Sequence, residues 1–263
     1  MGVPPVRPMP ESQPPTDQPV NSPSTFSAPL LNWYNTKMFR FLLCFLVSAL
    51  FAEEAPLTLP PAAKDYLPKG WKVLELASTD LNADGLADLV FVREEEDPKK
   101  IVKRLPANDG VRNYNPRVLV VLLAEANGYR KLGEYAKLIP PAFDDEREYC
   151  DDRFDGITGE KGVLTVGFRY WTSAGSGWAS LEKYKFRLES GRLRLIGSEL
   201  DTWHRSSEER FLVSTNHLTG KVKRTTGLNE FDEAKSKPEF EWSNLPSRKP
   251  IYIEDLPPCA REP

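Results

Sequence analysis

Short runs of strand-forming residues, separated by turn residues, recur along the chain from Trp71 onward. The run at 117–123 is almost wholly apolar, whereas residues 184–188 alternate apolar and basic side chains. Such alternation is typical of half-buried antiparallel strands. No periodic helical pattern of ten or more residues follows residue 52. We therefore expect a mainly β fold of antiparallel sheets built from hairpins and meanders.

The first four expected strands form one sheet. Asn127-Gly128 joins the third strand to the fourth, because Asn-Gly readily supplies the positive φ angles of a tight turn. Residues 94–115 and 227–248 are expected to be irregular. The expected strands are 71–78, 88–92, 117–123, 129–138, 162–171, 178–189, 192–200, 211–215, 222–225 and 251–253.

The N-terminal part of the chain has the features of a leader. Nine of the 24 prolines fall within residues 1–37, a composition typical of disorder. Residues 41–52 then form an apolar run between basic residues and Glu53-Glu54, which is typical of a secretory signal peptide. This run is shorter than the ~20 residues of a membrane helix. A lipoprotein signal and a buried core helix are the alternatives.

These features predict the domain organisation and the location of the protein. We expect a periplasmic or secreted protein whose mature chain begins near Glu53, with residues 1–37 coming from an upstream start codon. The predicted segments are a disordered extension at 1–37, a signal peptide at 38–52, a linker with a short helix at 53–69, a single β-rich domain at 70–256 and a tail at 257–263.

Charge and cysteine content limit the function further. The formal net charge is −3, so the chain as a whole lacks the basic surface that nucleic acid requires. We expect no nucleic-acid partner and no stable membrane span. Removal of the leader would also remove Cys44 and leave Cys150 and Cys259, which can pair in an oxidising compartment. Two unpaired thiols are the alternative, since the sequence does not give the distance between the two residues.

A cation-binding pattern lies between the first two expected strands. Residues 80–88 carry oxygen side chains at positions one, three, five and nine, and Gly85 at position six permits a sharp bend. Calcium prefers six to eight oxygen ligands from carboxylates and carbonyls. An Asx-rich turn that binds no metal is the alternative. The expected Ca²⁺ ligands are the side chains of Asp80, Asn82, Asp84 and Asp88 and the backbone carbonyl of Leu86.

The position of this loop identifies the family that it resembles. A helix-loop-helix calcium site has a bidentate Glu at position twelve, where this chain has Phe91. The pattern Asp-x-Asn-x-Asp-Gly-x-x-Asp followed by an apolar strand resembles instead the calcium loop of FG-GAP or VCBS repeats, which occur in β-propellers. The resemblance covers one repeat, so we expect a sheet like a propeller blade and no full propeller.

A wider resemblance extends over roughly residues 70–255. The chain is similar to a group of secreted bacterial proteins of unassigned function that have a single FG-GAP-like loop. This resemblance implies export and a β-rich fold, and it implies no activity. The segments that carry it are 118–123, 128–129, 154–157, 162–166, 184–187, 195–197 and 216–221.

Candidate catalytic residues are few. His204 and His217 are the only histidines, and neither has a neighbouring nucleophile at a recognisable spacing. The acidic stretch 143–155 suggests a second metal site or, as the alternative, a solvated loop. Carboxylates adjacent in sequence, such as Asp144 and Asp145, do not establish the separation of about 5–10 Å that glycoside hydrolysis needs.

Aromatic residues around the glycine-rich turn 173–177 are a candidate ligand patch for a sugar or peptide, with core packing as the alternative. We therefore expect an exported, calcium-stabilised, β-rich binding or interaction module for an envelope protein or glycan. A cell-envelope hydrolase that acts on glycan or peptide through acidic residues is the alternative. The residues of the expected patch are Tyr170, Trp171, Trp178 and Trp203.

Overall fold

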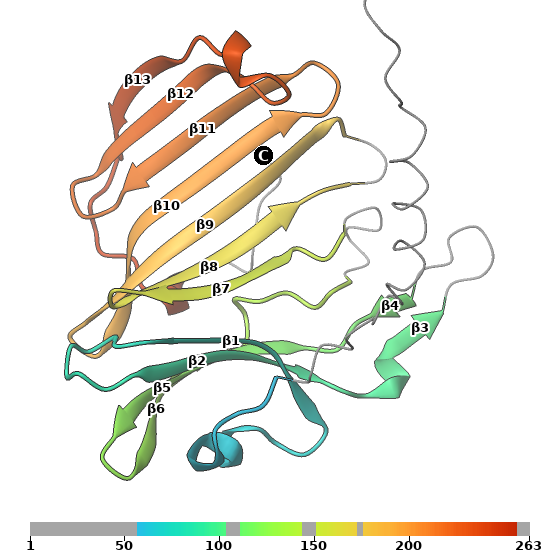
Figure 1. The fold of residues 1–263 in the computed structure, drawn as a ribbon, viewed down its shortest axis with the longest axis vertical. Coiled ribbons are helices and arrows are strands. Elements are labelled where there is room, and N and C mark those ends of the chain that lie inside the picture. Colours follow the sequence, from blue (N-terminus) through green and yellow to red (C-terminus); the bar gives the residue numbers. More distant parts are fainter. Residues whose placement is uncertain (1–56, 104–110, 144–150, 173–175, 257–263) are drawn as a thin grey trace, which may run out of the picture. The chain divides into compact units, whose positions relative to one another are not determined.

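The computed structural model describes residues 57–103, 111–143, 151–172 and 176–256. These residues form a mainly β fold, in which two antiparallel sheets account for more than half of the described residues (Figure 1). The prediction of antiparallel sheets built from hairpins and meanders is confirmed. The predicted extension at 1–37, the signal peptide at 38–52 and the tail at 257–263 lie outside the described residues.

The first sheet is the predicted four-stranded meander, in the order β1-β2-β5-β6. Ala126 and Asn127 form the turn that joins β5 to β6, because Glu125 pairs with Gly128, the first residue of β6. The predicted Asn127-Gly128 turn is therefore wrong by one residue, and only Gly128 of the pair has a positive φ, of 143°. The strands are β1 (Trp71–Thr79), β2 (Asp88–Glu95), β5 (Arg117–Glu125) and β6 (Gly128–Tyr135).

The central strands of this sheet have apolar side chains on both faces, and both faces are buried. Val90 and Val92 of β2 lie in the main core, whereas Phe91 lies in a smaller core on the opposite face. The 3-10 helix η1 (Pro61–Tyr66) covers the smaller core with Ala63, which is fully buried. The expected short helix in the linker is therefore present and closes one side of the sheet.

The second sheet has seven strands in strict sequence order, from β13 at one edge to β7 at the other. Leu164, Val166 and Phe168 of β8 are buried in the main core, so alternate residues such as Gly167 face the opposite side. The strands are β7 (Phe154–Glu160), β8 (Val163–Tyr170), β9 (Trp178–Glu189), β10 (Arg192–His204), β11 (Glu209–Asn216), β12 (Lys221–Asn229) and β13 (Glu239–Asn244).

The two sheets share one core and also meet along the edge strands β1 and β7. The Gly162 backbone N–H donates to the Thr79 hydroxyl at 3.1 Å. A Cβ atom at Gly159 would lie only 2.9 Å from the Thr79 Cβ, so the absent side chain permits this close approach. The β1–β7 contact therefore places the first sheet beside the face of the second sheet that points away from the core, where Gly167 lies.

Three of the expected elements are corrected. Residues 227–248 were expected to be irregular but contain η4 (Glu233–Lys235) and β13, whose six residues are all exposed. Residues 251–253 form a single bridge and the start of η5 (Ile253–Asp255) in place of a strand. Residues 94–115 contain η2 (Pro98–Lys100) and a small hairpin of β3 (Ile101–Lys103) and β4 (Val111–Asn113). Within the described ranges, no helix is both long and apolar enough to cross a membrane.

Candidate functional site

The predicted cation loop is a tight turn closed by its own side chains. The Asp80 carboxylate accepts the backbone N–H groups of Asp84 at 3.2 Å and Gly85 at 2.9 Å. The Asn82 Oδ1 atom accepts the Asp84 N–H at 3.0 Å, and Asn82 Nδ2 donates to Asp84 Oδ2 at 2.8 Å. Gly85 has a φ of 86°, as the bend requires. The spacing therefore brings Asp80, Asn82 and Asp84 together on one turn.

Asp88 lies apart from these three side chains, fully buried at the start of β2. One of its oxygens accepts the Leu81 N–H at 2.8 Å, and the other accepts the Ala124 N–H at 2.7 Å. Burial raises the pKa of Asp88, the two backbone N–H groups act in the opposite direction, and the charges of Asp84 and Asp80 raise it further. Asp88 therefore ties the loop to the end of β5.

The loop fits calcium in part. In the described part of the chain, no three His, Cys, Asp or Glu side chains are grouped so that they could hold a metal ion. The oxygens of Asp80, Asn82 and Asp84 nevertheless share one turn, and a carboxylate oxygen that accepts one N–H keeps a second lone pair for a cation. The Asx-turn alternative accounts for the same hydrogen bonds without a metal.

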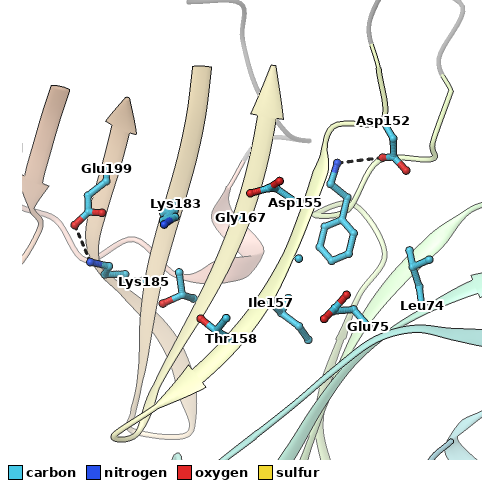
Figure 2. Close-up of a pocket in the computed structure, with 13 residues that line it drawn as sticks. Leu74, Glu75, Asp152, Asp155, Ile157, Thr158, Gly167, Lys183, Lys185 and Glu199 are labelled. Carbon is cyan, nitrogen blue, oxygen red and sulfur yellow. Dashed lines mark hydrogen bonds and ion pairs between the residues drawn. The ribbon is translucent and has the colours of Figure 1, made fainter. Parts of the chain in front are cut away.

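A groove of about 700 Å³ lies at the edge of the seven-stranded sheet, beside β1. Figure 2 shows that residues from β1, β7, β8, β9 and β10 line it, with Glu75, Asp155 and Lys183 coming from three different strands. Leu74 and Ile157 supply apolar surface at the β1 side. The groove therefore combines charged and apolar groups, as small-ligand sites do.

The charged groups of the groove divide into paired and unpaired sets. Lys185 pairs with Glu199 at 2.7 Å. In contrast, no hydrogen bond or ion pair to another described residue engages the side chains of Glu75, Asp155 or Lys183. Burial raises the pKa of Glu75, because its carboxylate loses water without gaining a cationic partner. Two carboxylates and one ammonium group are therefore available to a ligand.

A buried ion cluster holds one wall of the groove in place. Arg117 on β5 is 3% exposed and donates through both terminal nitrogens to Asp152, each at 2.7 Å. Its Nε atom donates to buried Glu94 at 2.7 Å, and Lys72 pairs with the other Glu94 oxygen at 3.0 Å. Burial lowers the pKa of Arg117, but Asp152 and Glu94 together outweigh that effect and raise it. Arg117 therefore connects the first sheet to the segment that leads into β7.

The four expected patch aromatics do not form one exposed surface. Tyr170 is only 6% exposed, so the prediction that it belongs to a ligand-binding patch is wrong. Trp178 pairs with His204 and packs against its ring, whereas Trp203 pairs with Ala179. Because successive strand residues point to opposite faces, Trp178 and Trp203 lie on opposite sides of the sheet. The Arg205 guanidinium stacks on Trp171, 4.7 Å from the ring centroid.

The histidines have structural contacts. His217 Nε2 lies 2.9 Å from the Ser198 hydroxyl, and burial lowers the pKa of His217. His204 Nδ1 accepts the Ser207 N–H at 3.1 Å. Neither histidine lines the groove. The combination of a histidine and two carboxylates in one cleft, which would have favoured hydrolysis, is therefore not present in this groove.

The structure describes only some of the remaining predicted residues, which are the two cysteines and the acidic stretch 143–155. Cys150 and Cys259, and residues 144–150 of the acidic stretch, lie outside the described residues. Asp152, from the same acidic stretch, is engaged by Arg117. Sequence reasoning missed the groove. The alternation of Lys183 and Lys185 with apolar residues in β9 was the available signal for a polar sheet face.

Comparison with known proteins adds no relative. The chain matches no protein-family model, no curated protein and no solved structure.

Proposed function

We propose that this chain is an exported, calcium-stabilised β-rich module that binds a polar ligand from the cell envelope in the groove beside β1. The observation that supports binding is the set of unpaired charged groups, Glu75, Asp155 and Lys183, in a groove of about 700 Å³. Charged groups inside a concave site that lack partners are available to orient a ligand. The resemblance to secreted proteins with an FG-GAP-like loop supports export and the calcium proposal.

Filling the groove should abolish binding. A Gly167→Val variant adds a side chain to the groove floor, where a Cβ would lie 3.4 Å from the Asp155 carbonyl oxygen. The control is Ala62→Val, which enlarges a side chain at an exposed position on η1 outside the groove. Envelope extract is passed over each immobilised protein, and the retained small molecules are identified by mass spectrometry.

We expect wild type and Ala62→Val to retain the same compounds, and Gly167→Val to retain at least tenfold less, a loss of ~1.4 kcal/mol. Equal retention by Gly167→Val would exclude the groove as the binding site. The hydrolase alternative has one supporting observation, since Glu75, with its raised pKa, shares the groove with Asp155. Shortened products that disappear in a Glu75→Gln variant would favour hydrolysis over simple binding.

Calcium should stabilise the loop. Asp80, Asn82, Asp84 and the Leu86 carbonyl are the groups that would hold the ion, with Asp88 behind them. A ligand present at 100 times its dissociation constant adds about 2.7 kcal/mol to the free energy of unfolding. For a domain of this size, that corresponds to a melting temperature about 5–10 °C higher in calcium than in EDTA.

The calcium effect has a matched control. An Asp80→Ala variant should lose the difference between calcium and EDTA, whereas Asp65→Ala, at an exposed position on η1, should keep it. Both variants are followed by thermal melting. Identical melting temperatures of the wild-type protein in calcium and in EDTA would support the metal-free Asx turn.

A further inference from the structure

In the groove, side chains of opposite charge lie on the two sides of Gly167, whose backbone has no side chain above it. Gly167 on β8 pairs in register with Lys183 on β9, and Asp155 lies on the other side, on β7 (Figure 2). Gly167 has no side chain to cover this strip, and Asp155 and Lys183 form no ion pair with each other. A bound group can therefore lie over Gly167 and contact both charges.

The strand spacing sets the length of such a ligand. Neighbouring strands lie about 4.8 Å apart, so β7 and β9 are separated by roughly 10 Å. An extended peptide advances about 3.3–3.6 Å per residue. A peptide of two or three residues therefore spans the distance between the Asp155 strand and the Lys183 strand.

Glu75 adds a second carboxylate on the Asp155 side. It reaches the groove from β1, where a Cβ at Gly156 would lie 4.0 Å from the Glu75 Cδ. No described cation pairs with the Glu75 carboxylate, and burial raises its pKa. A ligand ammonium group would supply that compensation, and Lys183, the unpaired cation on the opposite side, would pair with a carboxylate.

We propose that the groove binds a short peptide with both ends free, with its ammonium group at Asp155 and Glu75 and its carboxylate at Lys183. This inference rests on the groove being the binding site of the module. Thr158 and Thr165 offer hydroxyl groups to the peptide backbone, and Leu74 offers apolar surface to a side chain. The opposite charges favour a zwitterion over a neutral sugar, because only a zwitterion would form ion pairs with both sets of charges.

Capped peptides test the assignment of each end. Titration calorimetry compares trialanine with N-acetyl-trialanine, which lacks the ammonium group, and with trialanine amide, which lacks the carboxylate. We expect each cap to weaken binding to the wild-type protein at least tenfold. In an Asp155→Asn/Glu75→Gln double variant, acetylation should have no further effect. In Lys183→Gln, amidation should have no further effect.

Surface variants outside the groove serve as controls. Glu160→Gln on β7 and Lys221→Gln on β12 change exposed charges and should reproduce the wild-type response to both caps. Equal binding of all three peptides would overturn the zwitterion assignment, and so would capping effects that persist unchanged in the groove variants. If no peptide binds while Gly167→Val still loses the ligands retained from extract, the peptide inference fails and the groove remains the binding site.

Discussion

Replacing Arg117 with methionine should lower the free energy of unfolding by about 3–5 kcal/mol, because it leaves a buried carboxylate without its main partner. Glu94 is 2% exposed and would keep only its contact with Lys72 at 3.0 Å. Asp152 would lose both of its short bonds to the guanidinium group. Urea unfolding with a constant m-value measures the loss.

Two variants separate this effect from a general loss of charge. The Arg117→Met/Glu94→Met double variant should recover part of the stability, since both buried charges are then absent. Arg130→Met removes an exposed ion pair with Glu125 and should cost less than about 1 kcal/mol. If Arg117→Met were no more destabilising than Arg130→Met, the buried cluster would not be a principal connection between the sheets.

Replacing Asp88 with alanine should lower the free energy of unfolding by about 2–6 kcal/mol, even in EDTA. The Leu81 and Ala124 N–H groups would both lose their acceptor, and each buried unsatisfied donor costs about 1–3 kcal/mol. Asp88→Asn keeps one acceptor oxygen and should cost less. Thermal and urea unfolding of each variant in EDTA measure this structural contribution without calcium.

The matched control is Asp84→Ala, since Asp84 is exposed on the same loop. In EDTA it should cost much less than Asp88→Ala, because its carboxylate accepts from only one backbone N–H, that of Leu86. In calcium the cost of Asp84→Ala should rise. An Asp88→Ala variant that is destabilised only in calcium would mean that Asp88 acts solely as a metal ligand.

The first sheet was predictable because its sequence is unambiguous. The runs in β2 and β5 are apolar on both faces, and both faces are buried. Strand β7 was missed because the sequence Phe154-Asp155-Gly156 is typical of a turn. The pairing register also shifts between Phe154 and Ile157, so the strand has no regular alternation at its start. Strand β13 was missed although charged and aromatic residues alternate in it, because the run is short and packs no side chain into the core.

The candidate site was only partly predictable. The spacing of residues 80–88 predicts a turn closed by oxygen side chains, and the hydrogen bonds of Asp80 and Asn82 confirm this turn; calcium stays a prediction. The groove depends on tertiary structure, because Glu75 belongs to the first sheet and Lys183 to the second. No local pattern places these two residues together.

The last strand of the second sheet also affects how the protein behaves at high concentration. Strand β13 pairs with β12 on one side, and its other side carries backbone groups that no described strand pairs with. An unpaired edge strand can pair with strands of other copies and so promote aggregation. The exposed aromatic residues Phe240 and Trp242 favour such association further. Glu239 and Glu241 alternate with these two aromatics, so the strand carries charges that oppose stacking of identical chains.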